Sequence, residues 1–337
     1  MISAAKLFAR ALPLVAAYLF ASPAAANDST AELGAGGLAY VTTDKISMRS
    51  EDLYISLDEV RVRYEFVNTS DEDVTSLVAF PMPEIKGDID FLSAVPVEDP
   101  ENFLGFETTV DGVPVEAKVE QRVTALGVDQ TARLRALGLP LAPQLRETRD
   151  ALDQVPESEW DTLIGLGLVG VEEYDAGQGW ERHIAPIWFL STTFYWEQTF
   201  PAGKTTIVEH RYKPSVGQTA GVSFAFDWAR TEDWFRAYRA RFCMDDDFLA
   251  AFDRAEQKNP GTHFENRIEY ILKTAANWAG SIEKFHVTID KGDPKNLVSF
   301  CGDGVTKTGP TTFEMTKENF WPTEDLSILI LTVGPHE

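Results

Sequence analysis

Apolar and polar side chains alternate strictly along residues 60–66, and this pattern constrains the fold more than any other feature of the chain. Apolar residues at the even positions are separated by Arg61, Arg63 and Glu65. This period of two places the apolar side chains on one face of a half-buried β-strand. Residues 68–71 then end the strand, because their polar side chains bond their own backbone in turns. The segment predicts a sheet with one face in a core.

Further strand signals run along most of the chain. Residues 75–80 form an apolar run that stops at two prolines in 81–83, and proline cannot donate to a strand ladder. Asp111-Gly112 is a strong hairpin signal between two apolar stretches. The Trp- and Phe-rich run 187–200 and its neighbour 205–212 predict a second hairpin. Later strands are expected at 285–289, 297–300, 311–315 and 326–333, the last of them buried.

Helical spacing appears in two parts of the chain. Leucines separated by charged residues predict helices at 129–137 and 143–152, and a third helix is expected to start near Pro156. Two more helices are predicted at 246–257 and 264–276, separated by a turn at 259–261. The helices would interrupt the sheets or cover them.

These elements predict a mainly β fold with helical insertions. The expected architecture is an antiparallel β-sandwich, either one extended domain or two packed β-domains. The expected divisions are a signal peptide at 1–26, an N-terminal β-domain at 27–120, a helical insertion at 121–176, and a C-terminal β-rich domain at 177–337 whose two helices lie near 246–276.

The first 26 residues have the pattern of a secretory signal peptide. Lys6 and Arg10 precede an apolar run at 11–20, and Ala24 and Ala26 supply small residues before a cleavage point at Asn27. A membrane anchor is the alternative reading, but a ten-residue apolar run is shorter than the roughly 20 residues needed to span a bilayer. We expect a periplasmic mature chain without a transmembrane segment.

The charge balance excludes one class of partner. The chain has 53 Asp and Glu against 30 Lys and Arg, a formal net charge of −23. Nucleic-acid binding depends on basic patches that release counterions, so no nucleic-acid partner is expected. The predicted leader holds two basic and no acidic residues, which makes the exported portion more acidic still.

The chain contains two cysteines, Cys243 and Cys301, and both lie in the exported region. An even number without CxxC spacing in an oxidising compartment favours a structural disulfide over a metal or redox site. Two free buried thiols are the alternative.

No catalytic motif is present, and no cofactor or catalytic residue is predicted. The five histidines are scattered, without the spacing that sets two imidazoles on one metal, so no metal site is expected. Calcium remains open at three acidic groups, although solvated turns explain them equally well. These groups are residues 71–73, residues 245–247, and Asp290 with Asp293 and Asn296.

Aromatic residues are concentrated between 180 and 238, mixed with histidine, arginine and glutamate. Such a mixture is typical of a ligand cleft with aromatic faces, and also of a sandwich core in which alternate residues point inward. The candidate ligand-binding residues are Trp188, Tyr195, Trp196, His210, Trp228 and Trp234.

Several stretches of the mature chain carry specific motifs. They include ISMRSEDL at 46–53, VAFPMP at 78–83, YWEQTFPAG at 195–203, HRYKPSVG at 210–217 and YILKTAANWAGSI at 270–282, beside residues 27–38 and 60–66. Together they resemble the exported bacterial family of domains of unknown function numbered forty-four twenty-four. That resemblance implies membership but no activity or catalytic residue.

A shorter segment has a second likeness. Residues 66–83, with 105–107 and 111–119, are similar to the β-domain of the vault and inter-alpha-trypsin type, a protein-interaction sandwich.

Three hypotheses for the function follow. The first is a non-enzymatic periplasmic protein that binds a protein or an envelope component. The second is a carbohydrate or small-molecule binder that uses the aromatic segment. The third is a hydrolase with a site assembled only in three dimensions from Glu197, His210 and Asp227.

Overall fold

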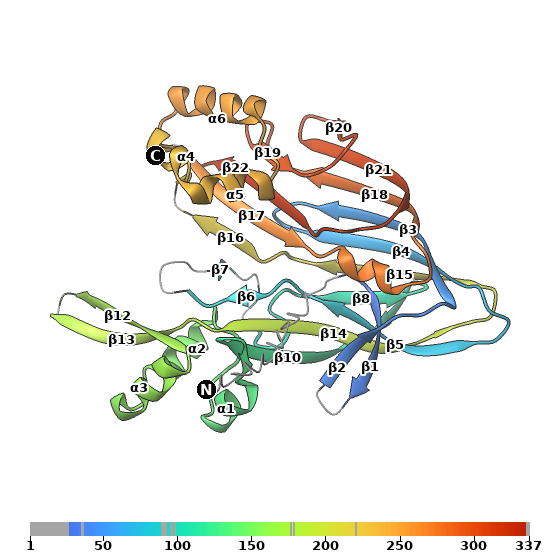
Figure 1. The fold of residues 1–337 in the computed structure, drawn as a ribbon, viewed down its shortest axis with the longest axis horizontal. Helices are drawn as coiled ribbons and strands as arrows, with labels where there is room; N and C mark the ends of the chain where they lie inside the picture. The colour runs from blue at the N-terminus through green and yellow to red at the C-terminus, as the bar shows by residue number, and fades with distance from the viewer. Residues whose placement is uncertain are drawn as a thin grey trace, which may run out of the picture.

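The computed structural model describes residues 27–34, 37–88, 93–94, 97, 99–175, 177, 179–219 and 221–334. The predicted signal peptide lies outside these residues, apart from the position that would follow its cleavage, Asn27. The described chain folds into three sheets, a two-stranded hairpin and several helices (Figure 1).

Sheet A has seven strands and combines distant parts of the sequence. Its central strands are β10, β14 and β5, which pair antiparallel. In spatial order the path is β11 (Val128–Asp129), β10 (Lys118–Ala125), β14 (Phe189–Phe200), β5 (Val74–Pro81), β1 (Ser29–Gly34) and β2 (Gly37–Val41), with β6 (Ile85–Lys86) also on β14.

Sheet B has eight strands and joins the two ends of the chain. Strand β18 pairs parallel with β3, and every other pairing in this sheet is antiparallel. The order is β20 (Thr306–Lys307), β21 (Thr312–Phe320), β18 (Ile282–Asp290), β3 (Ile46–Ile55), β4 (Val60–Asn68), β15 (Thr205–Tyr212), β8 (Glu107–Val110) and β9 (Val113–Val115).

Sheet C has five strands, and helices lie along one side of it (Figure 1). Its order is β19 (Leu297–Phe300), β22 (Leu326–Val333), β17 (His263–Tyr270), β16 (Val216–Thr219) and β7 (Ser93–Ala94). The helices on it are α4 (Asp227–Thr231), α5 (Asp233–Arg241) and α6 (Asp246–Lys258). The hairpin β12 (Val169–Asp175) and β13 (Trp180–Pro186) projects beside α2 (Arg146–Leu152) and α3 (Glu157–Gly165), whereas α1 (Thr131–Ala136) lies against β10.

One continuous core binds the three sheets together. The predicted strand around residues 60–66 is confirmed as β4, and its apolar side chains are buried as the alternation requires. The phenol of Tyr64 lies 3.0 Å from that of Tyr270 on sheet C, and His210 of sheet B lies 4.8 Å, ring centre to ring centre, from Phe80 of sheet A. The predicted mainly β, antiparallel sandwich fold is confirmed, with sheet B facing both other sheets.

Strand β22 shows how sheet C is covered on both faces. Ile328 and Ile330 belong to the main core, whereas Leu329 and Leu331 pack in a second cluster with Phe242 and other residues of the helical side. A continuous apolar run is what a strand buried on both faces needs. The prediction of a buried strand at 326–333 is confirmed.

The predicted hairpin between 187–200 and 205–212 is wrong. Strand β14 pairs with β5 and β10 in sheet A, whereas β15 pairs with β4 and β8 in sheet B. The chain therefore passes from sheet A to sheet B at Pro201–Lys204, and the link from β4 to β5 passes beside it in the opposite direction, from sheet B to sheet A. Asn68 connects the two crossings, because its side chain donates to the carbonyl of Phe200 (2.8 Å) and its backbone N–H donates to that of Lys204 (3.2 Å).

The predicted helix at 264–276 is also wrong. Its apolar residues Phe264, Ile268 and Leu272 fit helical spacing, but the segment forms strand β17 followed by a short 3₁₀-helix, Lys273–Asn277. Pairing with β16 and β22 on either side determines its conformation. The helices predicted at 129–137, 143–152 and 246–257 form with shifted ends, whereas α4, α5 and the β12–β13 hairpin were not predicted.

Strand pairing connects the two sides of the domain boundary predicted at residue 120. Strand β10 continues through that position, and sheets A and B each contain strands from both sides of the predicted helical insertion. The helices α1 to α3 are inserted between β11 and β12.

The predicted disulfide is confirmed. Cys243 and Cys301 are bonded, with their Cα atoms 5.0 Å apart. Cys243 follows α5 and Cys301 follows β19, so the bond fastens the helical side to the edge strand of sheet C.

Replacing both cysteines by serine should lower the free energy of unfolding by about 2–4 kcal/mol, because the unfolded chain regains the freedom of a closed loop. Denaturant unfolding of the variant and the wild type measures the difference. Reducing the wild type should give the same shift and leave the variant unaffected. An unchanged wild-type midpoint under reducing conditions would contradict a stabilising role.

Candidate functional site

The structure separates the predicted ligand-binding residues into three environments. Trp188 is fully buried, and its indole N–H donates to the carbonyl of Leu141 (2.8 Å). Trp196 is buried on the inner face of sheet A, 5.4 Å from the His210 ring. Tyr195 is half-buried on the opposite face of the same strand. The aromatic run on β14 therefore contributes mainly to the core.

His210 lies in the core and pairs with Asp28. Its Nε2 is 3.0 Å from Asp28 Oδ1, and both side chains are inaccessible to solvent. Burial raises the pKa of Asp28, while the charge and hydrogen bond of His210 lower it. Aromatic rings surround the imidazole, so no substrate reaches it from outside. The pair holds the segment around Asp28 against sheet B.

Trp228 and Trp234 lie on the surface instead. They are 64% and 42% exposed, on the consecutive helices α4 and α5, and Phe226 before them is 64% exposed. The rings of Phe226 and Trp228 are nearly parallel, with centres 6.4 Å apart. These three residues, which we call the aromatic surface, are separated from the buried Trp188, Trp196 and His210.

The hydrolase cluster predicted from Glu197, His210 and Asp227 is not assembled. Glu197 is exposed on the outer face of β14, and Asp227 is exposed at the start of α4, whereas His210 is buried. A general base and its partners must lie within hydrogen-bond reach of one substrate. This arrangement does not provide that.

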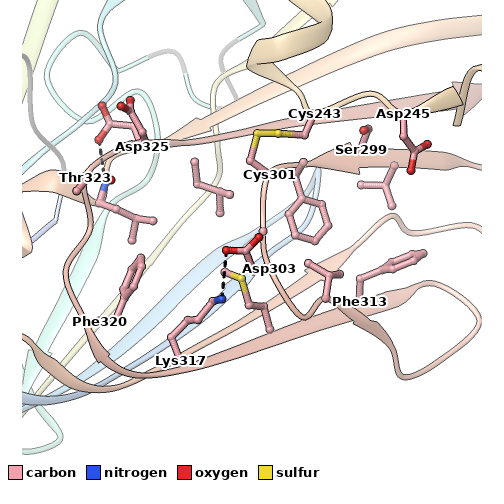
Figure 2. A pocket seen from close by; sticks show the side chains of 18 of the residues that line it. Cys243, Asp245, Ser299, Cys301, Asp303, Phe313, Lys317, Phe320, Thr323 and Asp325 are labelled. Carbon is pink, nitrogen blue, oxygen red and sulfur yellow. Dashed lines mark hydrogen bonds and ion pairs between the residues drawn. A yellow bond between two sulfur atoms is a disulfide. The ribbon is translucent and has the colours of Figure 1, made fainter.

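A cleft of about 660 Å³ opens between the edges of sheets B and C, beside the disulfide (Figure 2). Its apolar lining comes mainly from β19, β21 and the segments that flank them, with Phe248 of α6 and Leu272 in addition. Phe300, Phe313 and Phe320 are half-buried there, so part of each ring remains in contact with solvent. The other apolar lining residues include Val298, Val305, Met315 and Leu326.

The polar part of the cleft is mostly acidic. Lys317 is the one basic residue among its lining residues and lies 3.8 Å from Asp303. The Asp325 carboxylate accepts hydrogen bonds from the backbone N–H groups of Leu272 and Lys273 and pairs with the Lys273 ammonium (3.0 Å). Figure 2 shows the Asp303–Lys317 pair between Phe320 and Phe313, with Asp325 at the left of the view and Asp245 at the right. The four lining carboxylates belong to Asp245, Asp303, Glu324 and Asp325.

Sequence patterns did not reveal this cleft. Its residues come from four separate segments, 243–248, 272, 298–305 and 313–326. Each segment alone has an ordinary strand or turn composition. The cysteine pair was the one signal that could have brought two of the segments together, because the disulfide forms part of the cleft wall.

The acidic groups considered for calcium act as local acceptors. Asp245 caps α6 by accepting from the Phe248 N–H (2.7 Å), and Asp293 accepts from the Lys295 N–H (2.7 Å). Within the described residues, no group of three or more His, Cys, Asp or Glu side chains is arranged to hold a metal ion.

Comparison with known proteins identifies the family. A family model described as "Domain of unknown function (DUF4424)" matches residues 26–329. The chain belongs to this family. The resemblance predicted from its motifs is therefore confirmed, whereas the likeness to the vault-type β-domain stays a prediction. No curated protein matches the chain.

One solved structure with a similar chain comes from Legionella pneumophila subsp. pneumophila str. Philadelphia 1 and is described as a "putative nutrient binding protein". It is 16% identical, the similarity covers 91% of this chain and 70% of that one, and the TM-score is 0.44. None of the described helices is both long and apolar enough to span a membrane.

Replacing His210 by alanine should lower the free energy of unfolding by about 3–5 kcal/mol, because Asp28 would keep its buried carboxyl without a partner. Thermal and denaturant unfolding measure the change. His286→Ala is the matched control, since this histidine also pairs with an aspartate, Asp52, but on the outer face of sheet B. Equal effects of the two substitutions would contradict the structural role of His210.

Proposed function

We propose that this chain is a non-enzymatic binding protein of the bacterial periplasm, and that it binds an amphipathic, cationic envelope component in the cleft beside the disulfide. The observation that carries the proposal is the combination of three half-buried phenylalanines with an acidic rim. Such a ligand would bury an apolar body against the rings and place its positive charge at the carboxylates.

The size and lining of the cleft support a ligand site. Small-molecule sites occupy about 300–1,000 Å³ and combine apolar walls with a few polar groups. The cleft falls within this range, at about 660 Å³. Covering the exposed parts of Phe300, Phe313 and Phe320 would contribute roughly 25 cal/mol for each Å² of apolar surface removed from water.

The charges favour a cation over an anion. Lys317 is already close to Asp303, and Lys273 is paired with Asp325. Glu324 and Asp245 add further negative charge to the rim. The acidic balance of the whole chain adds a negative field that attracts cations toward the cleft.

The absence of enzymatic activity is part of the proposal. The buried His210–Asp28 pair has no route to a substrate, and Glu197 and Asp227 lie on the surface away from it. The cleft offers carboxylates, one lysine and apolar rings, a set suited to holding a ligand.

The aromatic surface supports a second candidate function, recognition of a protein or a carbohydrate. Exposed tryptophans are enriched at interfaces, and parallel exposed rings are suited to stacking. The two parallel rings of Phe226 and Trp228 are the observation that favours it.

Ligand binding can be tested with n-octylamine and n-octanoate, which share an apolar chain and differ in charge. Titration calorimetry should show saturable binding of octylamine and at least about tenfold weaker binding of octanoate. Phe313→Ser should weaken octylamine binding by about tenfold, because it removes apolar contact area. The emission of Trp321, which is 56% exposed and follows Phe320, should change on binding.

The matched control is Phe189→Ser, which removes a 38% exposed phenylalanine outside the cleft. It should leave octylamine binding unchanged, as should Trp228→Ala on the aromatic surface. Equal binding of both probes, or loss of binding in Trp228→Ala alone, would contradict a cationic ligand in the cleft.

Export can be tested by replacing single residues before Asn27. Ala26→Gln should block cleavage, because the −1 position requires a small side chain, whereas Ala25→Gln at the −2 position is the control and should be processed normally. Cell fractionation and intact mass measure location and processing. The wild type should be periplasmic and begin at Asn27. Recovery of the wild type from the cytoplasm with its leader intact would contradict export.

A further inference from the structure

The first described residues are enclosed in the core. Asn27, Asp28 and Ser29 have no exposed surface, and Thr30 is 2% exposed. The backbone N–H of Asn27 donates to Thr274 Oγ1 (2.5 Å), and the Thr274 hydroxyl donates to the Asn27 carbonyl (2.7 Å). The Trp278 indole donates to the Asp28 carbonyl (2.6 Å). Residues 27–30 are therefore an integral part of the packed structure.

A β-bulge directs a carboxyl group toward Asn27. The register between β3 and β4 shifts between Met48 and Ser50, so that both Met48 and Glu51 face the core although three positions separate them. Glu51 is fully buried, accepts from Asn27 Nδ2 (3.0 Å), and lies 3.4 Å from the Tyr270 hydroxyl.

The buried cluster contains more acid than base. Two fully buried carboxyls, Asp28 and Glu51, share it with one imidazole, His210. The cluster also contains three hydroxyl groups, those of Tyr64 on β4, Tyr270 on β17 and Thr274 on the 3₁₀-helix. No lysine or arginine of the described chain bonds to either carboxyl. Asp28 Oδ2 and Asn27 Oδ1 have no hydrogen-bond partner among the described residues. The cluster therefore has one basic side chain for two carboxyls, and two of its oxygens lack a donor.

We infer that the α-ammonium group of Asn27, created by cleavage of the Ala26–Asn27 bond, is the missing cation and binds in this cluster. Hydrolysis of that peptide bond converts the Asn27 amide nitrogen into an ammonium group with three donors. One donor replaces the present bond to Thr274, and the other two become available to the carboxyl of Glu51, which already accepts from Asn27 Nδ2, and to the unpartnered oxygens of Asn27 and Asp28. This inference rests on the export and cleavage proposed above.

Proteolytic processing would thus complete the core. In the uncleaved chain, burial raises the pKa of Glu51 to about 8, and the negative charge of Asp28 adds to this effect. The carboxyl is then protonated at neutral pH. In the cleaved chain the ammonium favours the ionised form and lowers that pKa. Burying the ammonium or the Glu51 carboxylate without the other would cost folding free energy. The two charged groups should therefore be buried together.

The decisive comparison is between a chain that begins at Asn27 and one that keeps Ala25 and Ala26 in front of it. The chain that begins at Asn27 should melt at least about 5 °C higher at pH 7. In the extended chain the folded state holds a proton on Glu51 that the unfolded state releases above pH 4.5. Its stability should therefore fall as the pH rises from about 4.5 to about 8, and this decline should be absent from the other chain.

Glu51→Gln should reduce the difference in melting temperature between the two chains to less than about 2 °C. Glu283→Gln is the matched control at an exposed position of the same sheet and should leave the difference intact. Equal melting temperatures of the two wild-type chains, or a difference that persists in Glu51→Gln, would overturn the inference.

A chemical measurement covers the case in which Glu51→Gln does not fold. The α-amino group of the folded wild-type chain should resist acylation and react only after denaturation, because it is enclosed. Acylation at the rate of the denatured chain would overturn the inference. A periplasmic chain that begins at another residue would overturn it too, whereas octylamine binding in the cleft would be unaffected, which separates this inference from the proposed ligand.

Discussion

The packing of one apolar face of sheet B against two other sheets is the constraint on which the rest of the structure depends. The side chains of β4 and β15 contact sheet A through His210 and Phe80, and sheet C through Tyr64 and Tyr270. A single sheet serving two partners requires strands to cross the core from one layer to another. The two adjacent crossings after β4 and β14 run in opposite directions. Asn68 joins them, and together they fix sheets A and B relative to each other.

Local patterns in the sequence predicted much of the strand content because burial on one face imposes alternation and burial on both faces imposes a continuous apolar run. β4 and β22 show these two cases. The hairpin predicted between 187–200 and 205–212 is wrong for a physical reason. A short link between two apolar strands is compatible with their pairing side by side in one sheet and also with their packing face to face in two sheets. β17 was mistaken for a helix because Phe264 and Ile268 satisfy both periods, and its neighbours β16 and β22 decide the outcome.

The candidate sites were harder to predict because each depends on contacts between distant segments. The aromatic run signalled a core as much as a cleft, and the structure uses Trp188 and Trp196 for the core while Trp228 and Trp234 remain on the surface. The inward orientation of Glu51 depends on a bulge, and a bulge has no signature in residues 46–55. The cleft combines edge strands of two sheets, so its phenylalanines read as ordinary strand residues along the chain.

The parallel pairing of β3 with β18 also affects the order in which the chain can fold. Strand β3 covers residues 46–55 and β18 covers residues 282–290. More than 200 further residues must therefore be synthesised after β3 before the two strands can pair. Contacts between residues so far apart in sequence slow folding. A strand edge that remains unpaired during this time promotes aggregation. A chain synthesised from its N-terminus would therefore hold β3 unpaired on that side until the last quarter of the protein arrives. Folding of the central sheet is consequently a late event that depends on the complete chain.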